Sequence, residues 1–250
     1  LNEHLAGFDQ LVLQRETANS AAARKELDAL LKNLDKLIYF ASRKKYKIAV
    51  ISEYGITEVE RAIHVNRALR KAGLLQVRKT AGIELIDTYK SRAWALADHQ
   101  IAHVFVRNPD DIPATVTALE KLDGVEEIAV GTAKAELGVE HPNSGDIVLV
   151  AKNKYWFNYH FWMNEATMPP YARTVDIHSK PGYDPLELFF NRTTMTIETK
   201  NTGMVRGSHG RIPESEDNFG VLITRQSSSG PAGQALGCWE LPGFIRSVVL

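Results

Sequence analysis

The stretch Lys47-Ile48-Ala49-Val50-Ile51-Ser52-Glu53-Tyr54-Gly55 is an apolar run followed at once by polar residues and a glycine. The run from Lys47 to Ile51 predicts a buried strand, and Ser52 to Gly55 predicts the loop at its carboxyl end. In open α/β sheets, ligands bind in the crevice at the carboxyl ends of the strands. Glu53 and Tyr54 are therefore candidates for a functional site, and a simple turn is the alternative.

Helical patterns flank this strand on both sides. Apolar residues recur at three- and four-residue steps from Ser20 to Lys45, which predicts an amphipathic helix that ends in a basic run. A second helix is predicted from about Glu58 to Lys71, with Gly73 as its C-terminal cap. Helix, strand, loop and helix in this order predict an α/β protein with a doubly wound sheet.

The pattern of predicted helices, strands and turns divides the chain into three segments. Residues 1–75 predict the first part of the α/β core, 76–157 an inserted α+β subdomain, and 158–250 the return to the core. The elements predicted in the insertion are strands at 92–97, 101–106, 125–130 and 146–151, with a helix at 113–122. In the last segment, 186–190 and 221–224 are apolar enough for core elements.

Composition excludes several classes of protein. The 250 residues carry thirty basic and thirty acidic side chains, so no long-range field favours nucleic acid or an anionic membrane. No apolar stretch approaches the roughly 18 residues of a membrane-spanning helix, so we expect no membrane partner. The single cysteine, Cys238, excludes an internal disulfide and a cysteine-rich metal cluster, and it fits a cytoplasmic location. Composition does not indicate the oligomeric state.

Two strings could contribute to a metal site. His209 lies in Arg206-Gly207-Ser208-His209-Gly210, where glycines let backbone approach a ligand and imidazole can bind a metal. A glycine-rich turn with an exposed histidine is an equal alternative. Asp176 and His178 alternate along an extended segment, so they can share one side of it. They could bind a cation directly or form a surface pair, and we favour a tight loop beside a site.

Other histidines and aromatic residues favour structural roles. His103 lies in an apolar strand pattern, which predicts a packed, hydrogen-bonded histidine. The aromatic run from Tyr155 to Trp162 could stack a base, although core packing is the interpretation we favour. The sequence contains no nucleophile elbow, phosphate-binding loop or dinucleotide fingerprint. The residues by themselves thus indicate a soluble α/β protein with a possible metal or phosphate site.

In their order along the chain, these strings resemble the type I phosphodiesterase and nucleotide pyrophosphatase branch of the alkaline phosphatase superfamily. Supporting strings are His64 to Leu69, Gly73 to Leu75, Ala102 to Val106, Gly124 to Glu127, His141 to Asp146 and Asp176 to Pro185. The likeness spans roughly residues 30–220. It implies a partial alkaline-phosphatase-like doubly wound sheet with a small inserted α+β subdomain, in which this chain is the C-terminal half.

The resemblance also implies a site. Members of this family hold two zinc-like divalent ions over a phosphate, which stabilise the charge on the phosphoryl oxygens. His209 matches a late histidine ligand of one ion, and Glu53 and Tyr54 fall where the family has an Asp-His pair for the other. Glutamate still offers a hard oxygen ligand, whereas a neutral phenol is a poor substitute for imidazole. Asp176 and His178 are candidates for the site or its surroundings.

The remaining parts of the family site are expected near or before the start of the chain. A further Asp and His, four residues apart, should precede the Ser20 helix, where this chain offers Asp9 or Gln10, and Gln14. Glutamine is a weak zinc ligand. The serine or threonine nucleophile is expected upstream of Leu1.

Two functions follow from this resemblance. The first is a metal-dependent hydrolase of phosphodiester or nucleotide pyrophosphate bonds, which acts on a small phosphorylated substrate such as a nucleotide and uses zinc. The second is a non-catalytic relative that keeps the fold for binding or assembly.

Overall fold

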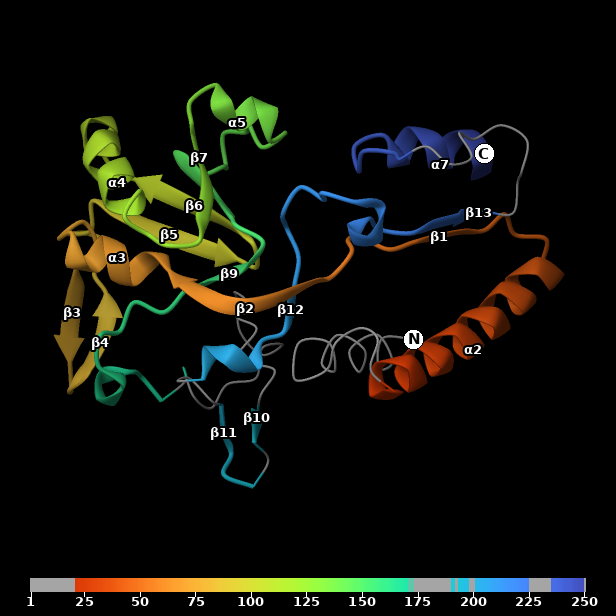
Figure 1. The fold of residues 1–250 in the computed structure, drawn as a ribbon, viewed down its shortest axis with the longest axis horizontal. Coiled ribbons are helices and arrows are strands. Elements are labelled where there is room, and N and C mark those ends of the chain that lie inside the picture. Colours follow the sequence, from red (N-terminus) through yellow and green to blue (C-terminus); the bar gives the residue numbers. More distant parts are fainter. Residues whose placement is uncertain are drawn as a thin grey trace. The chain divides into compact units, whose positions relative to one another are not determined.

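A computed structural model describes residues 21–170, 172, 190–191, 193–197, 201–224 and 235–249 (Figure 1). The chain forms two compact units. We call the described residues of 21–56 and 212–249 the terminal unit, and those of 57–211 the central unit. In the described residues, no helix is both long enough and apolar enough to cross a membrane. The segment boundaries expected after residues 75 and 157 stay a prediction.

The terminal unit contains the predicted first helix and strand. The helix α2 spans Ala21–Arg43, which confirms the amphipathic pattern, and Arg43 provides the basic charge in its last turn. The strand β1 (Ala49–Ile51) pairs antiparallel with β13 (Leu222–Thr224). The expectation that this strand is buried is wrong, because β1 lies in a two-stranded sheet and Ile51 is 39% exposed. The short 3-10 helix η6 (Glu216–Asn218) precedes β13, and α7 (Leu241–Val249) follows it.

The central unit begins with a strand where we expected a helix. Residues predicted as the first half of a helix form β2 (Thr57–His64), and only Val65–Lys71 are helical, as α3. Val59 and Ile63 are buried in β2, since β2 lies between β9 (Lys154–Asn158) and β12 (Gly207–Ser208). Pairing with these two strands therefore outweighed the helical spacing.

A glycine marks the end of α3. Gly73 adopts φ +74° just beyond the helix, which confirms the predicted C-terminal cap.

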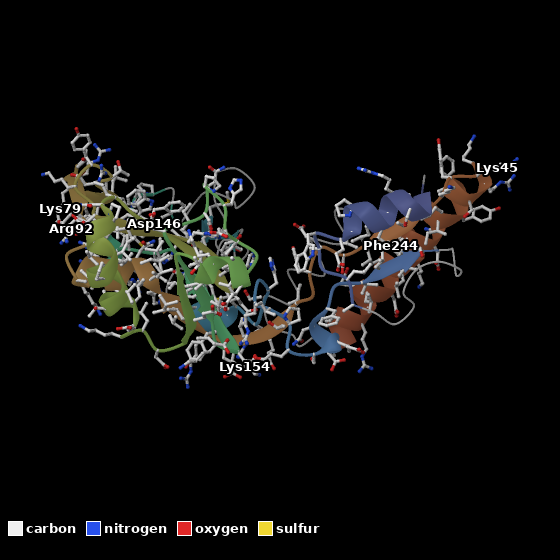
Figure 2. All side chains as sticks on the ribbon, turned by 90° about the horizontal axis from the view of Figure 1, so that it is seen from above. Lys45, Lys79, Arg92, Asp146, Lys154 and Phe244 are labelled. Atoms are coloured by element: carbon white, nitrogen blue, oxygen red, sulfur yellow. The ribbon has the colours of Figure 1, made fainter. Side chains whose placement is uncertain are left out.

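β9 runs parallel to β2, and ion pairs connect the two strands. The ammonium of Lys154, labelled in Figure 2, lies 2.7 Å from a carboxylate oxygen of Glu58 and 3.3 Å from one of Glu60. These surface ion pairs join the two strands at one end.

A four-stranded antiparallel sheet forms the centre of this unit. Its strand order is β5 (Ala93–Asp98), β6 (Ile101–Val106), β8 (Ile147–Ala151) and β7 (Val125–Val130). α3 contacts β5 and α4 (Ile112–Leu119) contacts β7, so helices cover this sheet on one side (Figure 1). These elements confirm the strands and helix predicted in the α+β segment. Helices together with several sheets confirm the α/β class.

Smaller elements complete the described part of the central unit. The hairpin of β3 (Val77–Thr80) and β4 (Ile83–Ile86) was not predicted. Short pieces are η1 (Pro109–Asp111), α5 (Ala133–Glu136), η2 (Glu165–Thr167), β10 (Phe190–Asn191), β11 (Thr196–Ile197) and η5 (Thr202–Met204). Apart from Phe190, the apolar segment expected at 186–190 lies outside the described residues.

Aromatic residues after β8 pack into the core. The side chains of Trp156, Phe157, Phe161 and Trp162 are almost fully buried, which confirms core packing for this run. His103 is half-buried and its Nδ1 accepts a hydrogen bond of 3.1 Å from the backbone N–H of Gly145. This contact confirms the prediction of a packed, hydrogen-bonded histidine.

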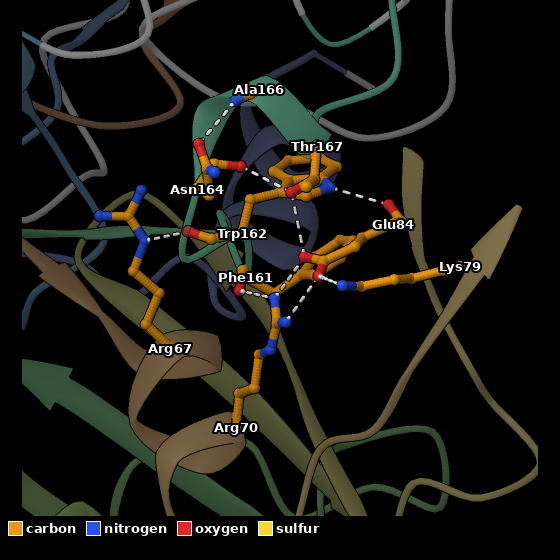
Figure 3. Close-up of polar contacts among 9 residues, drawn as sticks. All are labelled: Arg67, Arg70, Lys79, Glu84, Phe161, Trp162, Asn164, Ala166 and Thr167. Carbon is orange, nitrogen blue, oxygen red and sulfur yellow. Dashed lines mark hydrogen bonds and ion pairs between the residues drawn. The ribbon is translucent and has the colours of Figure 1, made fainter. Parts of the chain in front are cut away.

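A buried carboxylate joins α3, β4 and the segment that follows β9 (Figure 3). Glu84 is only 4% exposed, and both its oxygens accept hydrogen bonds from the guanidinium of Arg70, at 2.8 and 3.0 Å. The hydroxyl of Thr167 donates to the same carboxylate at 3.1 Å. The indole N–H of Trp162 donates to the backbone carbonyl of Glu84 at 2.8 Å. The Glu84 cluster, formed by these four residues, therefore ties three segments of the chain together.

Asn66 satisfies the backbone of β5 at the edge of the four-stranded sheet. Its side-chain oxygen accepts from the N–H of Ala95 at 2.8 Å, and its amide nitrogen donates to the carbonyl of Ala95 at 2.9 Å. The same nitrogen donates to the carbonyl of Tyr159 at 3.0 Å. Asn66 is 2% exposed, so it pairs with the edge strand as a neighbouring strand would.

Replacement of Asn66 by alanine is expected to lower the free energy of unfolding by about 2–3 kcal/mol. The substitution leaves an N–H and two carbonyl groups without their partner in a buried position. Urea unfolding followed by circular dichroism measures the loss. The matched control is Asn143→Ala at an exposed position, which should change the free energy of unfolding by less than about 0.5 kcal/mol. Equal losses in the two variants would contradict a special role for Asn66.

Candidate functional site

The loop from Ser52 to Gly55 lies against residues 218–221 within the terminal unit. The N–H of Ser52 donates to the carbonyl of Val221 at 2.8 Å, and the hydroxyl of Ser52 accepts from the N–H of Val221 at 2.6 Å. A Cβ at Gly55 would clash with the backbone carbonyl of Asn218, so only glycine fits this close approach. Ser52 and Gly55 thus hold the loop in place and leave the side chains of Glu53 and Tyr54 exposed.

His209 follows a short strand in the central unit. Ser208 pairs with Thr57 of β2, and both Gly207 and Ser208 are buried. Gly210 adopts φ +109°, where other residues are strained, and a Cβ there would lie 3.4 Å from the backbone nitrogen of Gln100. Strand pairing before His209 and a glycine after it therefore fix the course of the backbone through the histidine.

The turn between β5 and β6 contacts both the backbone and the side chain of His209. The backbone N–H of Gln100 donates to the carbonyl of His209 at 2.8 Å. The imidazole rings of His99 and His209 contact each other in a tilted arrangement, with centroids 3.8 Å apart and planes inclined by 34°. Sequence reasoning selected His209 as a candidate ligand but did not predict that His99 contacts it.

Both imidazoles are neutral near pH 7. Burial lowers the pKa of His209 to about 4, with a smaller contribution from repulsion by His99, and Asp98 opposes the shift. Burial also lowers the pKa of His99 to about 4. A neutral imidazole has a lone pair available for a metal ion or for a proton. The chemistry of His209 therefore fits the role of a metal ligand.

The complete ligand set remains a prediction. Glu53 and Tyr54 belong to the terminal unit and His209 to the central unit. Asp9, Gln10, Gln14, Asp176 and His178 lie outside the described residues. Among the residues that the structure describes, no group of three or more His, Cys, Asp or Glu side chains could hold a metal ion.

Comparison with known proteins identifies one family. The sequence model of the family described as type I phosphodiesterase / nucleotide pyrophosphatase matches residues 6–184, which is more than half of the chain. Glu53 and Tyr54 lie within this range, and His209 lies beyond it. No curated protein matches the chain.

Solved structures of one enzyme are similar to part of the chain. They show phosphonoacetate hydrolase from Sinorhizobium meliloti 1021 in complex with phosphonoformate and with phosphonoacetate. Each has 18% sequence identity and a TM-score of 0.38, over 59% of this chain and 36% of the hydrolase. The matched region thus spans about a third of the hydrolase chain.

Proposed function

Because this chain belongs to the type I phosphodiesterase / nucleotide pyrophosphatase family, we propose that it forms part of a metal-dependent hydrolase of phosphodiester or nucleotide pyrophosphate bonds. The family match supports the class of reaction. The observation in the structure that favours metal binding is the neutral, half-buried imidazole of His209, fixed between β12 and the turn at Gln100. The substrate class we propose is a small phosphodiester or nucleotide.

Divalent metal, with zinc as the proposed ion, would be held by His209 at one position and by Glu53 and Tyr54 at the other. The metal would supply positive charge to the phosphoryl oxygens during displacement. The protein's own contribution is positional, since Ser52 and Gly55 hold the loop of Glu53, and Gln100 holds the backbone of His209. A cytoplasmic location remains part of this proposal.

A non-catalytic relative is the second candidate function. Tyr54 favours it, because a phenol stands where the family resemblance places an imidazole ligand, and its side chain is 40% exposed. Such a protein would keep the fold for binding or assembly without a complete metal centre.

Metal content and hydrolysis together distinguish the two functions. We expect the purified full-length protein to bind about one or two zinc or manganese ions per chain and to hydrolyse an aryl phosphodiester such as bis-p-nitrophenyl phosphate. Metal content is measured by mass spectrometry after dialysis, and hydrolysis by the release of nitrophenolate. Less than about one metal per chain, together with no hydrolysis, would reject the hydrolase.

Replacement of Glu53 by glutamine tests the proposed ligand in the terminal unit. The substitution keeps the shape of the side chain and removes its charge, so we expect zinc affinity to fall at least about tenfold. Equilibrium dialysis with zinc chloride measures the affinity. The control is Asp28→Asn, which removes an exposed carboxylate from α2 in the same unit and should leave affinity unchanged. Unaltered affinity in the Glu53 variant would exclude Glu53 as a ligand.

A further inference from the structure

The turn between β5 and β6 has unusual residues and unusual burial for a hairpin. Asp98 pairs with Ile101, so His99 and Gln100 form a two-residue turn. Such turns favour Asn-Gly, because their residues adopt positive φ, and here His99 adopts φ +57°. Hairpin turns are also commonly exposed, yet His99 is 8% exposed and Gln100 is fully buried. A turn that departs from both rules indicates a functional constraint.

Both the side chain and the backbone of Gln100 form hydrogen bonds with neighbouring segments. Its side-chain oxygen accepts from the hydroxyl of Thr57 at 2.9 Å, and its side-chain nitrogen donates to the carbonyl of Tyr155 at 3.0 Å. Its backbone carbonyl accepts from the N–H of Ala151 at 2.9 Å, and its N–H donates to the carbonyl of His209 at 2.8 Å. Gln100 therefore ties the backbone of His209 to β2, β8 and β9.

His99 contacts the ring of His209, whereas Gln100 bonds the backbone of His209. The carbonyl of His99 accepts from the N–H of Phe157 at 2.7 Å, so its backbone is held by the start of the aromatic segment. Its imidazole lies against that of His209 at 3.8 Å between centroids. A Cβ at Gly210 would lie 3.6 Å from the side chain of Ile101, so the backbone after His209 also passes close to the start of β6.

We propose that the His99-Gln100 turn is a positioning platform for His209, in which Gln100 sets the backbone and the flat ring of His99 sets the orientation of the imidazole. His99 acts through its ring face and is not itself a metal ligand. The inference rests on the proposed metal-binding role of His209. Residues that orient a ligand typically change metal affinity by about 10- to 100-fold when they are replaced.

Two substitutions at His99 separate the ring face from the nitrogen atoms. His99→Asn removes the ring and tolerates positive φ, so it adds no backbone strain. His99→Phe keeps a flat ring and removes both nitrogens. We expect His99→Asn to weaken zinc binding about tenfold or more, and His99→Phe to restore binding to within about threefold of the unchanged protein.

Proton NMR of the metal-free protein tests the platform independently of metal. Because the rings of His99 and His209 lie with centroids 3.8 Å apart, we expect the ring current of His99 to shift the Cε1 proton resonance of His209 upfield, and His209→Ala assigns it. We expect His99→Asn to move this resonance downfield and His99→Phe to retain the upfield shift. An unmoved resonance in His99→Asn overturns the platform.

The zinc measurements distinguish the remaining outcomes. If His99→Phe binds zinc as weakly as His99→Asn, His99 acts through a nitrogen and the positioning role is wrong. If His209→Ala leaves zinc affinity unchanged, the proposed function fails, and the NMR result alone decides the platform. Thr57→Val removes the hydroxyl that donates to Gln100 and also lies 3.3 Å from the carbonyl oxygen of Ser208, and it gives a second test if His99→Asn does not fold. An unmoved His209 resonance in this variant overturns the role of Gln100.

Discussion

Replacement of His209 by alanine in the full-length protein is expected to lower metal-dependent hydrolysis of an aryl phosphodiester by about 100-fold or more. Among the proposed ligands, this imidazole has the chemistry that best fits a metal ion, because burial keeps it neutral near pH 7. Folding should be little affected, since the contacts that fix this segment are made by backbone atoms of Ser208 and His209. Initial rates with added zinc, together with the thermal unfolding midpoint, measure both effects.

The control for this variant is His141→Ala in the same unit. His141 is exposed, and its Nδ1 accepts a hydrogen bond of 3.1 Å from the N–H of Asn143, so it lies in a local turn. We expect its replacement to leave the rate within about twofold, as for most surface substitutions. An unchanged rate in the His209 variant would remove this histidine from the site. A lowered unfolding midpoint with a proportionate loss of rate would instead indicate a structural role.

The sequence predicts most of the central sheet because its signals are local. β5, β6, β7 and β8 each alternate or run apolar between turn residues, and Gly124 precedes β7 with φ +92°. β2 could not be predicted in this way. Its central position depends on β9 and β12, which are distant in the sequence, so tertiary pairing decides against the helical spacing.

The candidate site shows the same limit. His209 was proposed from the glycines around it, which are a local feature. His99 and Gln100 were missed because a polar turn of this kind is normally exposed, and only the fold buries it against His209. The sequence does carry one signal for these two residues: His-Gln stands at a two-residue turn, where Asn-Gly is favoured. The predicted ligands Glu53 and Tyr54 remain to be tested together with His209.

Replacement of Glu84 by glutamine is expected to lower the free energy of unfolding by about 3–5 kcal/mol. The carboxylate is buried and accepts two hydrogen bonds from Arg70 and one from Thr167, as Figure 3 shows. Glutamine would place an amide donor against these donors and would leave a largely buried guanidinium without its counter-charge. Urea unfolding at pH 7 measures the loss. The control is Glu58→Gln in the surface pair with Lys154, which should lose about 1 kcal/mol or less.

Acid should abolish the difference in free energy of unfolding between the unchanged protein and Glu84→Gln, because that difference depends on the charge of Glu84. The hydrogen bonds from Arg70 lower the pKa of Glu84 below 4.5, with help from Thr167, whereas burial opposes the shift. A lowered pKa means that the carboxylate stabilises the fold fully above pH 4.5 and loses this effect as the pH falls through the folded-state value. The free-energy difference between the unchanged protein and Glu84→Gln should therefore stay constant from pH 7 to about 5 and shrink below that. The histidines titrate alike in both proteins and cancel in the comparison. A difference that persists undiminished in acid would show that packing of the side chain, and not its charge, stabilises the Glu84 cluster.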